Sequence, residues 1–427
     1  MILAYRILTT VLYPLLLILI YCRKIFKKED PERYKEKILI SNFKIKDKGD
    51  SKLIWFHAAS IGEFKSILPI IQELSIKYPN LQFLSTTTTL SSGNLAKIEL
   101  QKYKNVEHRY FPLDVPFLIE KFISLWRPDR IFLVDSEIWP NLIFKAQQLK
   151  VPIALINGRL TFRSYKRWRR FKNTAKKIFG VFHLCLCSNN ETANYLRKFD
   201  ARNVYFKGNL KLIGEIEEKN IKNINEKFLK EKKFWFAASI HKEESLFCLK
   251  THMELKKNLK EIVSIIAPRH IQTSKEIESL AKKFGLKVQI LNKDENILED
   301  KEIIIINYFG ELQNYFKYTK SVFMGKSTIK RLKDDSGQNP IEAAKLKCKI
   351  YYGQYVYNFE EIYQFLEQNK IAARIRDYDE LSQNLIKDLR IPNKEKSINS
   401  DKIHVLGQKT LIDTINILNI FLKNENI

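Results

Sequence analysis

Residues 52–64 read KLIWFHAASIGEF, an apolar run followed at once by a serine, a glycine and a glutamate. Residues 52–58 are apolar almost throughout, which predicts a buried strand, and the pattern over residues 64–77 predicts a helix. Strands of this kind, separated by helices, are typical of a parallel sheet covered on both faces. We therefore predict an α/β fold.

The same order of strand and helix recurs along the whole chain. The first half offers further strand candidates at residues 81–85, 130–135, 151–156 and 183–188. After a polar stretch at 214–233 the series restarts, with candidates at residues 234–239, 261–267, 287–291, 302–306, 320–324 and 349–352. Two doubly wound units of similar size predict two Rossmann-like domains facing each other across a cleft. Ligands bind such sheets at the carboxyl ends of the strands.

The composition is that of a large globular protein. The 427 residues allow two or three domains, and 45% hydrophobic with 29% charged residues exclude a disordered or collagen-like chain. The formal net charge of +26 favours a polyanionic partner: nucleic acid, an anionic membrane surface or a phosphorylated lipid. Five cysteines, of which only Cys185 and Cys187 are close, predict a reducing compartment and no structural zinc.

An apolar segment near the start predicts a membrane anchor. Residues 7–22 are apolar apart from two threonines, and four basic residues follow, Arg23, Lys24, Lys27 and Lys28. The segment is shorter than the roughly 20 residues of a comfortable span, so a tilted span and an interfacial anchor both stay open. The basic flank predicts that residues 29–427 are cytoplasmic.

Glu63 and His57 stand at the carboxyl end of the first predicted strand. Glu63 falls in the first turn of the following helix, where backbone N–H groups favour a carboxylate, so it fits a helix cap as well as a general base. His57 fits a packed strand residue better than a catalyst.

A second group of polar residues follows the strand at 130–135. Asp135 and Glu137 stand two residues apart, and which of them faces the cleft stays open. Trp139 is interpreted as packing at a helix start. Farther along, Arg159 and Lys211 follow later strands and could bind an acidic substrate.

A basic segment covers residues 159–177, with nine basic residues and no acidic one. Tyr165, Trp168 and Phe171 lie between the charges, a pattern that fits a membrane surface as well as a nucleic acid. A plain solvated face is the alternative.

The second half carries three more polar strand ends. Arg269, after residues 261–267, could hold a phosphate. Residues 309–312 open a helix whose amides could face an anion, and Glu342 could accept hydrogen bonds from ribose hydroxyls. Together these features outline a nucleotide pocket. The sequence contains no glycine-rich phosphate loop of the usual types.

Several motifs, taken in order, resemble the Kdo (3-deoxy-D-manno-octulosonic acid) transferase family. They are HAASIGEF, YFPLDVP, DSEIWPNL, NGRL, GNLK, AASIHKEE, APRH, FGEL, GQNPIEAA and NFEE, from His57 to Glu361. The resemblance implies a GT-B fold and an inverting, metal-independent transferase without a cofactor. Such an enzyme moves Kdo from CMP-Kdo to a lipid A precursor (lipid IVA) in lipopolysaccharide core biosynthesis, at the cytoplasmic face of the anionic inner membrane.

The resemblance also implies roles for individual residues. Glu63 matches the general base, while Glu137 and Lys211 match residues for substrate orientation and charge stabilisation. The implied CMP-binding positions are Pro268, Arg269, Phe309, Gly310, Glu311, Asn339, Pro340, Ile341 and Glu342. Two departures fall near the donor: Lys326 stands where the family usually has a second glycine of GGS, and Gln338 where it has histidine.

The expected organisation has four parts: an anchor at residues 1–28, an acceptor-binding domain at 29–213, a CMP-Kdo-binding domain at 214–403 and a C-terminal helix at 404–427. The apolar tail at 406–422 could pack back on the first domain. Two other functions remain as alternatives, a GT-B transferase for a different nucleotide sugar and a membrane-tethered nucleic-acid-binding protein. The Kdo transferase interpretation expects no nucleic-acid partner.

Overall fold

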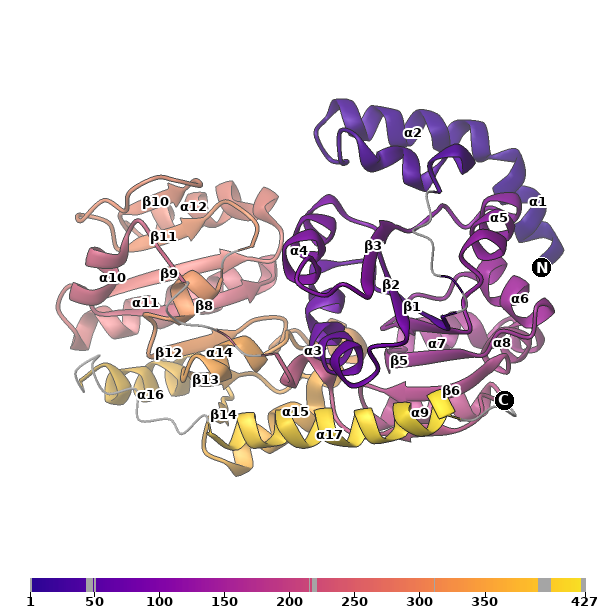
Figure 1. Cartoon of the computed structure of the whole chain (residues 1–427). Helices are drawn as coiled ribbons and strands as arrows, with labels where there is room; N and C mark the ends of the chain where they lie inside the picture. Colours follow the sequence, from indigo (N-terminus) through magenta and orange to yellow (C-terminus); the bar gives the residue numbers. More distant parts are fainter. Residues whose placement is uncertain are drawn as a thin grey trace. The chain divides into compact units, whose positions relative to one another are not determined.

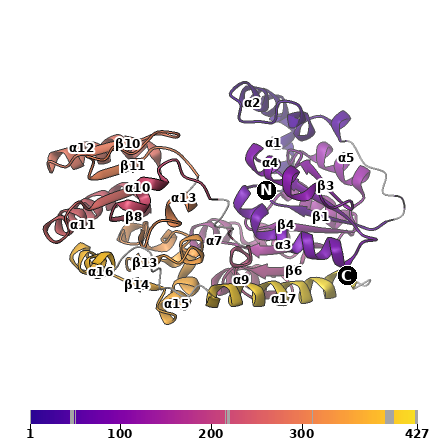
Figure 2. The ribbon, with the colours of Figure 1, turned by 60° about the vertical axis from the view of Figure 1, so that its left-hand side comes forward.

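The computed structural model describes residues 2–43, 49, 51–214, 216, 221–310, 312–390 and 401–423, in two compact units. Unit 1 comprises Met1–Gly214 with Leu406–Ile427, and unit 2 comprises Glu215–Val405. Each unit is built on a parallel sheet with helices on both of its faces (Figures 1 and 2). The predicted α/β class with two Rossmann-like domains is therefore confirmed.

Unit 1 contains a parallel sheet with the strand order β3-β2-β1-β4-β5-β6-β7. The chain order reverses between β1 and β4, so the carboxyl ends of these two strands form the switch point where ligands bind in such sheets. The strands are β1 (Leu53–His57), β2 (Gln82–Thr87), β3 (Val106–Tyr110), β4 (Arg130–Val134), β5 (Ile153–Gly158), β6 (Phe182–Cys187) and β7 (Val204–Phe206).

Two apolar cores explain why β1 reads as a continuous hydrophobic run. Leu53 and Trp55 belong to the core cluster on one face of the sheet. Ile54 and Phe56 belong to the cluster on the other face. Because alternate residues of a strand point to opposite faces, a strand covered on both sides must be apolar at every position.

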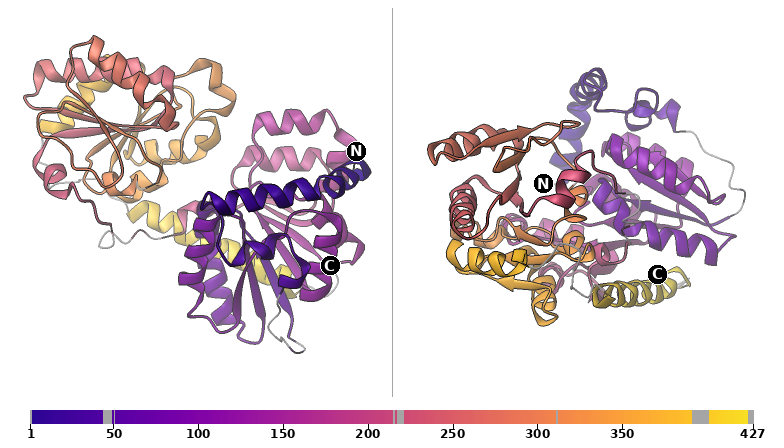
Figure 3. Two further views of the ribbon diagram at one scale, coloured as in Figure 1. Left: turned by 90° about the horizontal axis from the view of Figure 1, so that it is seen from above. Right: turned by 90° about the vertical axis from the view of Figure 1, so that its left-hand side faces the viewer.

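The helices of unit 1 cover both faces of this sheet (Figure 3). They are α3 (Ile61–Lys77), α4 (Leu90–Leu100), α5 (Pro116–Trp126), α6 (Pro140–Gln148), α7 (Phe162–Arg169), α8 (Lys172–Phe179), α9 (Asn190–Lys198) and α17 (Asp401–Lys423). The C-terminal helix α17 places Ile415, Leu418 and Phe421 in the core cluster of unit 1, so the tail does pack back on the first domain.

Unit 2 repeats this architecture with the strand order β10-β11-β9-β8-β12-β13-β14. Its strands are β8 (Phe234–Ile240), β9 (Val263–Pro268), β10 (Val288–Leu291), β11 (Ile303–Ile306), β12 (Ser321–Met324), β13 (Lys349–Tyr352) and β14 (Ala372–Arg374). Its helices are α10 (Glu226–Glu231), α11 (Ser245–Asn258), α12 (Ser274–Lys283), α13 (Gln313–Phe316), α14 (Ile341–Lys345), α15 (Glu360–Gln368) and α16 (Tyr378–Arg390). The switch point here lies between β8 and β12.

The apolar N-terminus corrects the expectation of one anchor helix. It forms two helices, α1 (Ile2–Val11) and α2 (Tyr13–Ile25), which are bent by 57°. Pro14, in the first turn of α2, lacks the N–H that would continue α1, which accounts for the break. No single helix in the described part of the chain is long and apolar enough to cross a membrane. The bent pair meets that test of length and composition only when both members are counted.

Candidate active site

The turn between β1 and α3 holds Glu63 at the carboxyl edge of the sheet. Ser60 is the N-cap of α3, and its hydroxyl donates to Glu63 Oε1 at 2.9 Å. The backbone N–H of Ala59 donates to Glu63 Oε2 at 2.8 Å. The same contacts therefore cap α3 and hold the Glu63 carboxylate in place. A capping role for Glu63 is thus compatible with a role as a general base.

The surroundings of Glu63 raise its pKa from 4.5 to about 7. Burial has the largest effect, and the negative charges of Glu137 and Asp135 act in the same direction. The hydrogen bonds from Ser60 and Ala59 oppose the shift because they stabilise the charged form. A carboxylate with a pKa near neutrality is suited to removing a proton at physiological pH.

Glu137 follows β4 and is held by two aromatic residues. Trp139 Nε1 donates to Glu137 Oε2 at 2.8 Å, and His57 Nε2 lies 3.2 Å from the same oxygen. His57 is fully buried, with Nδ1 3.0 Å from Thr86 Oγ1 and its ring stacked on Phe111. The prediction of a packed His57 is confirmed. Trp139 packs at the start of α6, as predicted, and its indole N–H also holds Glu137, a predicted site residue.

Asp135 faces the cation that the sequence placed at this edge. Lys211 Nζ lies 3.4 Å from Asp135 Oδ2. The backbone of Asp135 is left-handed, with φ 58°, which turns the chain sharply between the end of β4 and Glu137. The turn separates the two carboxylates: Asp135 meets Lys211, while Glu137 meets His57. Glu63, Glu137 and Lys211 thus gather at one edge of unit 1.

The basic segment forms α7 and α8 of unit 1. Its aromatic residues mostly serve packing: the Tyr165 ring stacks on Tyr195 at 4.1 Å, and Trp168 meets Phe179 edge-on. Phe171, at the junction of the two helices, is 56% exposed. Helix α7 buries none of its residues, so its arginines and lysines line the surface.

Unit 2 gathers basic side chains at the carboxyl ends of β8, β9 and β12. We call the cations Arg269 and Lys326, together with the imidazoles of His241 and His270, the cation cluster. The rings of His241 and His270 lie 5.6 Å apart, edge to face. Burial has the largest effect in lowering the pKa of His241, and the charges of Lys326, His270 and Arg269 lower it further, against the opposite pull of Glu244. An anion placed here meets a concentration of positive charge.

Glu244 organises this cluster and was not singled out from the sequence. Its fully buried carboxylate accepts backbone N–H bonds from Lys326 at 2.7 Å and Ser327 at 3.0 Å. It also accepts from the N–H groups of Thr328 and His241. One side chain thereby holds the loops after β8 and β12. The only sequence signal was its place within the HKEE motif.

Lys326 occupies a backbone position that favours glycine. Its φ is 57°, in the left-handed region. Glycine adopts this region without strain, which explains why glycine is usual at this position in the family. The Lys326 ammonium lies 3.0 Å from Asp335 Oδ2. The departure from the family pattern therefore adds a cation to the cluster at the expense of backbone strain.

The predicted CMP-binding residues divide into exposed and supporting groups. Arg269 and Phe309 are exposed after β9 and β11, and Asn339 and Glu342 are half-buried at the start of α14. Three others are buried and shape the backbone: Pro268, Pro340 and Ile341. Gly310 has φ 83°, and Glu311 lies outside the described residues. Asn339 Oδ1 accepts the N–H of Ile341 at 3.1 Å, so this asparagine holds the turn that leads into α14.

The described residues contain no group of three or more His, Cys, Asp or Glu side chains that could hold a metal ion.

Comparisons with known proteins show which family the chain is similar to. A family model described as 3-deoxy-D-manno-octulosonic-acid transferase (kdotransferase) matches residues 32–213. The 3-deoxy-D-manno-octulosonic acid transferase of Rickettsia bellii is 28% identical over 98% of this chain and 99% of its own length. The Haemophilus influenzae enzyme of the same name is 28% identical over 73% of each chain. The chain is therefore similar to the Kdo transferases, through the family model over residues 32–213 and through relatives that match nearly its whole length.

Solved structures place the chain in the GT-B fold. A glycosyltransferase from Rickettsia africae covers 88% of this chain with all of its own, at a TM-score of 0.57 and 9% identity. Anabaena HepE, in complex with UDP and glucose, covers 87% of this chain with 99% of its own, at a TM-score of 0.56 and 12% identity. At these identities the likeness shows the fold alone, two Rossmann-like domains.

Proposed function

We propose that the chain is an inverting glycosyltransferase that moves Kdo from CMP-Kdo to a lipid A precursor in lipopolysaccharide biosynthesis. Similarity to Kdo transferases, by a family model and by relatives along nearly the whole chain, supports the transfer of Kdo. The observation that carries the mechanism is the half-buried Glu63 carboxylate, whose pKa of about 7 follows from burial and from its neighbours Glu137 and Asp135.

In this mechanism Glu63 is the general base. A sugar hydroxyl of the acceptor donates its proton to the Glu63 carboxylate while the hydroxyl oxygen attacks the anomeric carbon of Kdo. The bond between that carbon and the phosphate oxygen of CMP breaks, and the new bond forms on the opposite face. Hydrogen bonds from Ala59 and Ser60 hold Glu63 in one orientation for this step.

Glu137 and Lys211 serve the acceptor side of the reaction. His57 and Trp139 fix the carboxylate of Glu137, which can then accept a hydrogen bond from a sugar hydroxyl. Lys211, beside Asp135, supplies positive charge at the same edge. The bisphosphorylated acceptor has negative charges for Lys211 and for the arginines of α7 to bind.

The leaving group is stabilised in unit 2. CMP departs with the bonding electrons as a phosphate monoester, and the cation cluster offers imidazole, guanidinium and ammonium groups for this charge. Among the exposed residues, Arg269 follows β9 directly and can bind two phosphate oxygens at once. Half-buried Glu342 remains the candidate for the ribose hydroxyls.

The helices α1 and α2 are proposed to lie in the membrane interface instead of spanning the bilayer. Tyr5 donates to Asp114 at 3.0 Å, and the side chain of Asn141 donates to Thr9 at 3.2 Å, so α1 is tied to unit 1 by polar contacts. The Tyr13 ring meets Phe117 at 4.9 Å. A spanning helix would lose these contacts. The opposite side exposes more than half of several apolar side chains, Leu3, Ile7, Leu8, Val11, Leu15 and Ile18.

An activity assay tests the proposal. Detergent-solubilised protein would be given CMP-Kdo formed in situ and a tetraacylated lipid A bisphosphate, with the product identified by mass. We expect product from the wild type, an unchanged rate for Glu73→Gln on the exposed side of α3, and a 10²- to 10⁴-fold lower rate for Glu63→Gln, on the order of a lost general base. Product from UDP- or GDP-sugars alone would favour the alternative donor class. Equal rates for both variants would leave Glu63 as a helix cap.

A further inference from the structure

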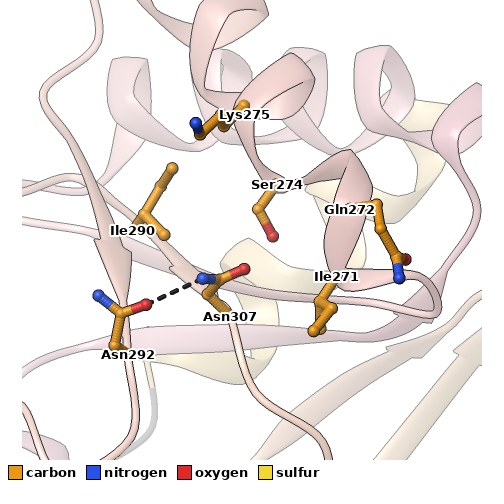
Figure 4. Close-up of a pocket in the computed structure, with 7 residues that line it drawn as sticks. All are labelled: Ile271, Gln272, Ser274, Lys275, Ile290, Asn292 and Asn307. Carbon is orange, nitrogen blue, oxygen red and sulfur yellow. Dashed lines mark hydrogen bonds between the residues drawn. The ribbon is translucent and has the colours of Figure 1, made fainter.

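Polar side chains without a role in the proposed mechanism lie in both units. In unit 2, Ser274 and Asn307 line a pocket of about 430 Å³ at the carboxyl ends of β10 and β11, and Asn307 Nδ2 donates to Asn292 Oδ1 at 2.9 Å (Figure 4). That pocket lies on the donor side of the proposed function. In unit 1, Lys37 and Glu29 form a buried ion pair that the proposed mechanism does not use.

Lys37 is buried at the end of the short 3₁₀ helix η1 (Arg33–Lys37). Its side chain is 3% exposed, and that of Glu29 is 2% exposed. The Lys37 ammonium donates to Glu29 Oε2 and, at 2.7 Å, to the backbone carbonyl oxygen of Thr88. The centroid of the Tyr110 ring lies 5.0 Å from the same ammonium. The ammonium is therefore enclosed and held in one position by these neighbours.

Glu29 connects Lys37 to the end of α2. Its Oε1 accepts a hydrogen bond from Arg23 Nε at 2.6 Å. Arg23 stands in the last turn of α2, and its side chain is 41% exposed. Because α2 is one of the two helices proposed to lie in the membrane interface, the ion pair links the end of an interfacial helix to the interior of unit 1.

The other contact of Lys37 leads to the turn that holds Glu63. Thr88 follows β2 directly, and its backbone N–H donates to the carbonyl oxygen of Ala59 at 3.1 Å. The N–H of the next residue donates to the same oxygen at 3.2 Å. Ala59 in turn donates its own N–H to Glu63 Oε2 at 2.8 Å. The loop after β2 thus holds Ala59 at its carbonyl, while the N–H of Ala59 holds the carboxylate.

Stability alone does not account for a buried ion pair at this place. Taking both charges out of water is costly, and apolar residues of similar volume stabilise a core as well or better. An ammonium does what an apolar side chain cannot, since it donates hydrogen bonds to two oxygens at once. The pair is therefore explained by the position that it imposes on the loop at Thr88.

We propose that Lys37 is a positioning residue for Glu63, an inference that rests on the proposed function. Glu29 holds the ammonium of Lys37, and the ammonium holds the carbonyl of Thr88. The loop at Thr88 holds Ala59, whose N–H stays directed at the Glu63 carboxylate. Lys37 touches neither substrate nor base, and it acts through the backbone between them.

This role predicts a shift of the pH dependence in one direction when Lys37 is lost. The N–H of Ala59 stabilises the ionised form of Glu63, so a weaker bond raises the pKa of this carboxyl. Glu137 and Asp135, the other carboxylates that act on Glu63, stay in place. The acidic limb of kcat/KM should therefore move to higher pH, by roughly half a unit. A loss of stability alone would lower the rate without moving the limb.

Kinetics of the full-length, detergent-solubilised protein with CMP-Kdo and a tetraacylated lipid A bisphosphate test this role. Lys37→Met alone leaves the charge of Glu29 buried, so the variant to measure is Lys37→Met with Glu29→Met, which removes both charges. We expect it to unfold at about the temperature of the wild type. Its kcat should be about tenfold lower, with a KM for CMP-Kdo within about twofold and the acidic limb at higher pH.

The matched control is Lys145→Met with Glu120→Met. It removes an ion pair of the same kind on the surface of unit 1, in which Lys145 Nζ donates to Glu120 Oε1 at 2.6 Å. Neither the rate nor the acidic limb should change in this control.

The outcomes separate this inference from the function on which it rests. A folded Lys37 double variant with the kcat and the acidic limb of the wild type would overturn the role of Lys37 and leave the proposed function standing. A lower kcat with an unmoved limb, or a double variant that does not fold, would assign the pair to stability and overturn the positioning role. A wild type that forms no product would overturn the proposed function, and this inference with it.

Discussion

The acid–base behaviour of Glu63 depends on the charge of Glu137. Burial alone would raise the pKa of Glu63, and the neighbouring carboxylates of Glu137 and Asp135 raise it further, to about 7. A base works only in its ionised form. The rate of the wild type should therefore fall about tenfold for each pH unit below about 7 and level off above that value.

Glu137→Gln should shift this pH dependence in a defined direction. Removing a like charge makes ionisation of Glu63 easier, so its pKa falls and the acidic limb of kcat/KM moves to lower pH, by roughly one unit. The absolute rate should also fall, because the acceptor loses a fixed hydrogen-bonding group. A pH series on wild type and variant measures both effects. An acidic limb that stays in place would show that the two carboxylates do not interact.

The side chains that the sequence identified are those that follow strands directly. Glu63, Glu137 and Arg269 each stand within a few residues of a strand end, so the α/β pattern was enough to place each of them at the carboxyl edge of its own sheet. The long-range contacts that fix the surrounding side chains and loops were not predicted. His57 and Glu244 act across 80 or more residues of sequence, on Glu137 and on the loop of Lys326, and no local pattern records such a contact.

Among the elements, α17 packs against the rest of unit 1 through a close approach, at Leu212, that requires glycine. A Cβ on Gly407 would lie 2.4 Å from the carbonyl oxygen of Leu212. The helix also bonds to the sheet domain through Tyr78, which donates to Asn419 at 2.9 Å. The apolar cluster formed by α17 therefore depends on the absence of a side chain at residue 407.

Gly407→Ala should consequently destabilise unit 1. The better helix propensity of alanine gains about 1 kcal/mol, but the clash with backbone cannot be relieved by a rotamer change and costs about 1–3 kcal/mol. The expected net result is a lower melting temperature and faster proteolysis of α17. Gln408→Ala, exposed on the next residue, is the control and should be neutral. A more stable Gly407→Ala protein would contradict the close packing.

The helices α1 and α2 yield a prediction about membrane binding. Leu15 and Ile18 are each 60% exposed on α2, close to the basic residues that end it. Leu15→Glu with Ile18→Glu should release the protein from anionic vesicles, since two charges replace buried apolar contacts with lipid. Gln383→Glu with Gln408→Glu makes the same charge change on exposed residues elsewhere and should leave binding intact. Vesicle sedimentation distinguishes them, and equal binding by both double variants would contradict the interfacial role.

The elements that the sequence missed share a physical cause. Strand β3 has the sequence VEHRY and lies at the edge of its sheet, where a polar strand is tolerated, so it shows no apolar run. The edge strands β7 and β14 have only three residues each. The central strands β1 and β8 are covered on both faces and were recognised within one or two residues of their ends.

At the scale of the whole molecule, the proposed mechanism assigns a different function to each unit. The general base Glu63 belongs to unit 1, and the cation cluster proposed to bind the phosphate belongs to unit 2. A ligand that binds only the folded state stabilises it by mass action, by about 2.7 kcal/mol at a hundredfold excess over its Kd. CMP should therefore raise the melting temperature of the wild type through unit 2. Glu63→Gln should show the same rise while being inactive, because its substitution lies in the other unit.

Arg269→Ala should abolish the rise given by CMP, since it removes the exposed guanidinium after β9 that we propose to bind the phosphate. Arg376→Ala, which removes an arginine 81% exposed elsewhere in unit 2, should keep it. Thermal unfolding of the four proteins with and without CMP supplies the comparison. Loss of the CMP effect in Glu63→Gln would mean that the base also binds the donor, and the division between the units would fail. Retention of the effect in Arg269→Ala would move the phosphate away from β9, toward the ammonium of Lys326.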